Sequence, residues 1–117
     1  GAFDKPIRSH DVSGFLFAIN SELFLSNRFM FDIRYSPCFF EEWDMGLQVM
    51  QAGLQLYVVP VQGFDHHWGM SQAEDERVIN YFGREVRRGD VMRENRKRFI
   101  KKWLHLIDFD KDLVAML

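Results

Sequence analysis

The chain has 117 residues, of which 47% are hydrophobic and 15% aromatic, and its formal net charge is -2. This composition excludes a disordered protein, and the length is typical of one globular domain, which we expect to span residues 1–117. No apolar run approaches the roughly 20 residues that a membrane-spanning helix needs. Because the single cysteine, Cys38, has no internal disulfide partner, we expect a cytoplasmic location.

The first two thirds of the chain predict two strands and two helices. A near-continuous apolar run predicts a buried strand over residues 12–20, and Asn20 and Ser21 are good N-caps for a short helix. Residues 41–52 predict an amphipathic helix that stops at Gly53. Its apolar stripe consists of Phe40, Trp43, Leu47, Met50 and Leu54, and the opposite side holds Glu41, Asp44 and Gln48. A second strand is expected at 56–59, ended by Pro60.

The last third, from residue 72 onward, reads as helix, with Gly83 and Gly89 dividing it into two pieces. One apolar stripe contains Val78, Ile79, Phe82 and Val86, and another contains Phe99, Ile100, Trp103, Leu104 and Ile107. Together these elements predict a mixed α/β fold with a helical C-terminal third.

Charge is unevenly distributed along the chain. Residues 84–102 contain nine basic and three acidic side chains, a net charge of +6, which leaves -8 for the rest. This asymmetry indicates a polyanionic partner, which would be an acidic membrane surface, a nucleic acid or the chain's own acidic part. The alternative is a solvated helix face with no partner.

Residues 39–71 concentrate the side chains that are suited to chemistry. The carboxylates of Glu41, Glu42 and Asp44 open the predicted helix, and His66 and His67 follow one strand later. Carboxylates and imidazoles in this order can converge on a metal ion or a proton-transfer site. The alternative is a solvated helix N-terminus with two structural histidines.

Six short motifs follow one another along the chain. They are a strand containing Gly14 that leads to Ser21-Glu22-Leu23-Phe24, then Phe31-Asp32, then Glu41-Glu42-Trp43-Asp44-Met45, then Gln51-Ala52-Gly53 with Tyr57-Val58-Val59-Pro60, then His66-x-x-Gly69-x-Ser71, and last Asn95, Phe99 and Lys102-Trp103. In this order they resemble the C-terminal, acceptor-side half of GT-A-fold glycosyltransferases of family 2.

The resemblance implies a partial GT-A-like mixed sheet from which the nucleotide-binding half is absent. It also implies inverting transfer of a sugar from a nucleotide-sugar donor to a hydroxyl on a glycan or lipid-linked acceptor. We expect the chain alone to be inactive, because the family's metal-binding Asp-x-Asp lies in the absent half. A sheet edge exposed by that absence favours a homodimer.

The resemblance also assigns roles to individual residues. Glu42 takes the position of the family's catalytic base, an Asp in most members, and the dipole of its helix favours the ionised carboxylate. Glu41 and Asp44 would line the same site. His66 or His67 would bind a divalent cation, Mn²⁺ or Mg²⁺, and the spacing to Gly69 and Ser71 favours His66. Trp43 and Trp68 would stack on sugar rings or, alternatively, pack in the core.

A second function remains open, that of a non-catalytic binding module. In this interpretation the basic segment 84–102 attaches the protein to the inner face of the membrane or to another polyanion. Aromatic residues interleave with the basic ones, but no nucleic-acid-binding motif is present, so we expect no nucleic-acid partner.

Overall fold

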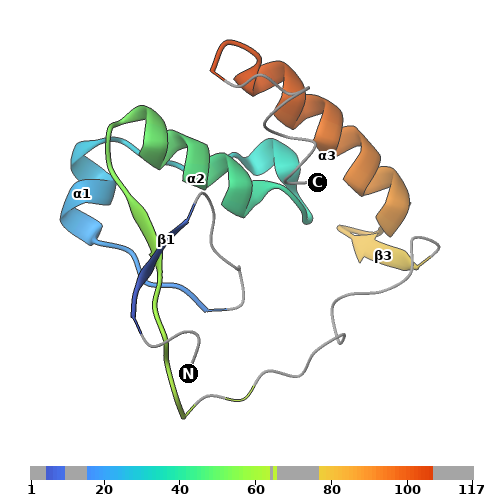
Figure 1. Cartoon of the computed structure of the whole chain (residues 1–117). Helices are drawn as coiled ribbons and strands as arrows, with labels where there is room; N and C mark the ends of the chain where they lie inside the picture. Colours follow the sequence, from blue (N-terminus) through green and yellow to red (C-terminus); the bar gives the residue numbers. More distant parts are fainter. Residues whose placement is uncertain (1–4, 10–15, 64, 66–76, 107–117) are drawn as a thin grey trace. The chain divides into compact units, whose positions relative to one another are not determined.

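A computed structural model describes residues 5–9, 16–63, 65 and 77–106 of the chain (Figure 1). The chain forms two compact units. Unit 1 comprises residues 1–33 and 41–72, and unit 2 comprises residues 34–40 and 73–117. In the described ranges there are two small antiparallel sheets and three α-helices, which confirms the predicted mixed α/β class.

The sheet of unit 1 consists of two short antiparallel strands. β1 (Ile7–Ser9) pairs with β2 (Leu56–Val58), and Ile7 lies opposite Val58. The prediction of β2 is confirmed, whereas a strand over 12–20 is wrong for the described residues 16–20, which form no strand. An apolar run is also suited to line a pocket, and periodicity does not separate the two outcomes.

Helix α1 (Ser21–Ser26) begins where the sequence predicts. The Asn20 side chain accepts a 3.0 Å hydrogen bond from the backbone N–H of Leu23, which satisfies a donor that the first helical turn leaves unpaired. At the other end, the Asn27 side chain donates a 2.8 Å hydrogen bond to the Leu23 carbonyl. Both ends of this short helix are therefore capped by asparagine.

Helix α2 (Glu41–Gln51) also matches its prediction, including its end. Gly53 adopts a φ of +77°, and the backbone N–H groups of Gly53 and Leu54 donate to the carbonyls of Met50 and Val49, both at 3.0 Å. These are the hydrogen bonds of a Schellman cap, which favours glycine because of its left-handed backbone. The predicted apolar stripe is only partly correct. Its member Leu47 is buried, but Met50 is 38% exposed, and the buried Met45 is not part of the predicted stripe.

Unit 2 contains a β-hairpin that corrects the prediction of helix at this place. β3 (Val78–Tyr81) pairs antiparallel with β4 (Arg84–Arg87), and the connecting residues Phe82 and Gly83 have φ values of +51° and +78°. Two consecutive positive φ angles are typical of a tight hairpin turn and exclude a continuous helix. Ile79 and Val86, assigned above to a helical stripe, are instead cross-strand partners.

Helix α3 (Arg88–Trp103) follows the hairpin without a break and runs through Gly89. Its core face is formed by Asn95, Phe99 and Trp103, which are 1%, 0% and 3% exposed. These residues are spaced four apart, so they lie on one side of the helix. The Phe99 ring lies 5.3 Å from the Phe40 ring, and Tyr35, from the short 3-10 turn η1 (Ile33–Tyr35), is also buried.

Among the described helices, none is both long enough and apolar enough to cross a membrane.

Candidate functional site

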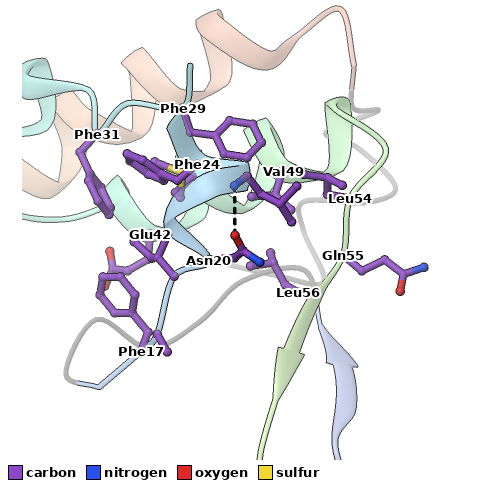
Figure 2. Close-up of a pocket in the computed structure, with 14 residues that line it drawn as sticks. Phe17, Asn20, Phe24, Phe29, Phe31, Glu42, Val49, Leu54, Gln55 and Leu56 are labelled. Carbon is purple, nitrogen blue, oxygen red and sulfur yellow. Dashed lines mark hydrogen bonds between the residues drawn. The ribbon is translucent and has the colours of Figure 1, made fainter. Parts of the chain in front are cut away.

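An apolar pocket with a volume of about 140 Å³ opens in unit 1 (Figure 2). Its wall is built from the segment before α1, from α1 itself, from the turn after it, from α2 and from the start of β2. Most of the lining side chains are aliphatic or aromatic, and the polar exceptions are Asn20, Glu42 and Gln55. The pocket therefore combines a large apolar surface with very few polar groups.

Four phenylalanines form the aromatic part of this wall. The Phe24 ring lies 6.1 Å from Phe29 and 6.3 Å from Phe31, and the Phe31 ring lies 6.2 Å from Phe17. All three pairs are tilted or edge-on, which are the arrangements that the ring quadrupole favours. The four rings thus form a connected cluster from Phe17 to Phe29.

Among the described residues, Glu42 is the only one that contributes a carboxylate to the pocket wall. It lies in the first turn of α2, so the helix fixes its backbone position. Its side chain is partly exposed. Of the two amides in the lining, Asn20 uses its side-chain oxygen to cap α1, and Figure 2 shows Gln55 extending away from the ring cluster. Glu42 is therefore the main side-chain hydrogen-bond acceptor that the wall offers a bound molecule.

Glu41 and Glu42 interact with each other. Burial raises the pKa of Glu41, and the nearby charge of Glu42 and a hydrogen bond to the Glu42 side chain raise it further, while a hydrogen bond to its own backbone acts in the opposite direction. The Oε2 atom of Glu41 is buried and has no hydrogen-bond partner in the described part of the chain. Glu41 is thus suited to donate a hydrogen bond to its neighbour, and it does not line the pocket.

The other predicted residues of α2 lie away from the pocket. Asp44 is 0% exposed, so it is not on a solvated helix face, and its Oδ1 accepts a 2.7 Å hydrogen bond from Gln48. Gln48 also donates to the Met30 carbonyl at 2.8 Å and accepts from the Met30 N–H at 3.2 Å. This polar side of α2 therefore fixes the turn after α1, which in turn positions Phe29 and Phe31. Trp43 is half-buried and does not line the pocket.

Three predicted site residues, His66, His67 and Trp68, lie outside the described residues. Within the ranges that are described, no three His, Cys, Asp or Glu side chains are arranged to hold a metal ion. The expected cation ligands His66 and His67 are not among these residues, so the binding of Mn²⁺ or Mg²⁺ stays a prediction.

The aromatic wall is the part of the site that the sequence analysis missed. The sequence pattern assigns Phe17 to a buried strand and leaves Val49 outside the predicted stripe of α2, yet both residues line the pocket. The signal that would have found the wall is the concentration of phenylalanine on both sides of the short capped helix, at residues 17, 24, 29 and 31. The apolar surface of these four side chains is larger than one short helix can bury.

The chain was compared with models of known families, with curated proteins and with solved structures, and none of the three comparisons found a match.

Proposed function

We propose that this chain is the acceptor-side part of an inverting glycosyltransferase, in which Glu42 is the general base. The proposal is supported by the order of the six sequence motifs and by one structural observation. The residue that takes the position of the catalytic base, Glu42, lies on the wall of the unit 1 pocket, in the first turn of α2.

The proposed reaction assigns to Glu42 the role of proton acceptor. The acceptor hydroxyl would transfer its proton to the Glu42 carboxylate while its oxygen attacks the anomeric carbon of the donor. The bond between that carbon and the phosphate oxygen then breaks, and the nucleoside diphosphate leaves with the electron pair. A positioned base typically contributes about 10²- to 10⁴-fold to such a step.

The experiment is a transfer assay on the complete gene product that contains this chain, with a panel of nucleotide sugars and NMR analysis of the product. A single displacement assisted by a base inverts the anomeric configuration, so inversion is the expected result. Retention of configuration, or no transfer with any donor, would contradict the proposal.

A second candidate function is attachment to an acidic membrane surface through unit 2. The observation that favours it is Phe82, which lies at the tip of the β3–β4 hairpin and is 88% exposed. Among residues 84–102, seven basic side chains are exposed against three acidic ones. Two of these acids, Asp90 and Glu94, pair with Arg93 and Lys97. Acidic lipids attract such cations by about 1 kcal/mol each, and an exposed ring can insert at the headgroup level.

Co-sedimentation with vesicles tests this attachment. The chain should bind vesicles that contain phosphatidylglycerol, should bind phosphatidylcholine vesicles much less, and should be released by salt. Phe82→Ser should weaken the binding, whereas Leu25→Ser, at a residue of unit 1 that is 73% exposed, should not. Equal binding to both vesicle types, or tighter binding to a DNA or RNA duplex, would contradict the membrane assignment.

A further inference from the structure

The size of the unit 1 pocket matches a single ring. Its volume is about 140 Å³. A cavity of roughly 150 Å³ lined by leucine, isoleucine and phenylalanine is large enough to hold benzene and stays free of water. The pocket here has a similar lining, in which Phe24, Phe29 and Phe31 form the aromatic side, with Met45 and Val49 from α2. A bound ring would therefore fit the pocket and lie against an apolar surface.

The same lining disfavours a sugar inside the pocket. A pyranose ring presents several hydroxyl groups, each of which needs a hydrogen-bond partner once it leaves water. The wall offers the Glu42 carboxylate and the amide of Asn20, whose oxygen already accepts from the Leu23 N–H at 3.0 Å, while Gln55 points away (Figure 2). The side chains of this wall can satisfy one polar substituent on a ligand and offer no partner to several further hydroxyl groups.

We propose that the pocket binds one apolar ring that has a hydroxyl group, of which phenol is the simplest example, with the hydroxyl directed at Glu42. The ring lies against the phenylalanine cluster, and its O–H donates to the carboxylate. The binding of such a ring does not depend on the function proposed above. Its assignment to the acceptor of the sugar transfer does. The glycosyltransferase would then modify a ring hydroxyl and not a glycan at this position.

The binding test uses the 117-residue chain and fluorinated probes, followed by ¹⁹F NMR titration. 4-Fluorophenol should bind, and Ala18→Phe should weaken it by roughly tenfold, because the new ring occupies the space of the ligand. Ala18 is an exposed lining residue outside any helix or strand, so the substitution does not disturb a core. The matched control is Ala52→Phe, an exposed alanine outside the lining, which should leave the affinity within about twofold of the original.

A second variant tests the direction of the hydroxyl. Glu42→Gln should weaken 4-fluorophenol binding by roughly tenfold, because a charge-assisted hydrogen bond becomes a neutral one, and should leave fluorobenzene binding unchanged. Equal losses for the two probes would show that Glu42 does not face the hydroxyl. Tighter binding of 4-fluorobenzylammonium than of 4-fluorophenol would mean that the carboxylate selects a cation, and it would overturn the proposal, as would the absence of any binding.

The failure of this inference is distinguishable from failure of the proposed function. If the complete gene product transfers sugar with inversion but the pocket binds no phenol, the ring assignment alone is wrong. If the pocket binds 4-fluorophenol in the way described and no transfer occurs, the pocket is a ring-binding site of a protein with another function.

Discussion

The side-chain amide of Asn95 donates a 2.8 Å hydrogen bond to the backbone carbonyl of Tyr35, across 60 positions of sequence. The same nitrogen lies 2.6 Å from the Cys38 carbonyl and 3.3 Å from that of Phe39. Phe39 has a φ of +78°, a left-handed conformation that costs a non-glycine residue about 1–2 kcal/mol. In unit 2, one buried amide on α3 therefore holds a strained segment of backbone.

Asn95→Ala should be among the most destabilising single substitutions in unit 2. It removes the side-chain amide that donates to the Tyr35 carbonyl in a buried site, and the loss of such a donor costs about 1–3 kcal/mol. We expect the free energy of unfolding, measured by urea denaturation, to fall by about 2–4 kcal/mol. Asn80→Ala is the matched control, because Asn80 is exposed and its side chain accepts a hydrogen bond from the Gly83 N–H at 3.2 Å. A loss at Asn95 no larger than that at Asn80 would contradict the role of this amide.

The end of α2 permits a separate test of the Schellman cap. A Cβ atom added at Gly53 would have no neighbour within 4 Å, so the effect of Gly53→Ala comes from the left-handed backbone alone. We expect a loss of about 1 kcal/mol in the free energy of unfolding, and a smaller loss for Gly53→Asn, since asparagine tolerates this conformation better. Equal losses for the two variants in urea denaturation would show that the backbone conformation is not the cause.

Elements determined by local signals were predictable from the sequence, and those determined by distant partners were not. The N-cap Asn20 and the C-terminal Gly53 define α1 and α2 through contacts within five residues. By contrast, β1 is a strand because β2 lies beside it, although Ile7 and Val58 are far apart in the chain. The β3–β4 hairpin was missed because Phe82 is not a usual residue at a turn position with positive φ.

The same division holds for the site. A motif within a single helix singles out Glu42, and the structure places it on a pocket wall, whereas its role as a base stays a prediction. The aromatic cluster was not predictable, because it brings together side chains from separate segments such as Phe17 and Phe31. The helical pattern assigns Asp44 to the side of α2 opposite the apolar stripe, but it is buried. It accepts a hydrogen bond from Gln48, which also bonds to the backbone at Met30, a partner distant in the sequence.

The raised pKa of Glu41 predicts a pH dependence of stability. The folded state holds this proton to a higher pH than the unfolded state, in which the pKa is near its usual value of 4.5. The free energy of unfolding that Glu41 contributes is therefore fully present below pH 4.5 and is lost as the pH rises through the raised pKa. The Glu41→Gln variant has no such proton to lose. The free energy of unfolding of this variant, relative to that of the unsubstituted protein, should thus increase between acidic and neutral pH. Thermal or urea denaturation measures this difference.

The neighbouring charge provides the control for this titration. In a Glu42→Gln background the repulsion that helps to raise the pKa of Glu41 is absent. The effect of adding Glu41→Gln to that background should then depend less on pH. An equal pH dependence in the two backgrounds would show that the coupling between the two carboxyl groups is absent. A stability difference that is independent of pH in both would show that the pKa of Glu41 is not raised.

The most direct test of the central claim, that Glu42 is the base of a sugar transfer, is the turnover of the Glu42→Gln variant of the complete gene product. The account predicts a loss of roughly 10²- to 10⁴-fold in kcat with donor KM within about threefold, because a base is removed and no donor contact is lost. Glu22→Gln, the same substitution in the first turn of α1, should leave both values unchanged. A Glu42→Gln enzyme that retains kcat within about tenfold would contradict the role of Glu42 as the base, since a positioned base contributes about 10²-fold or more.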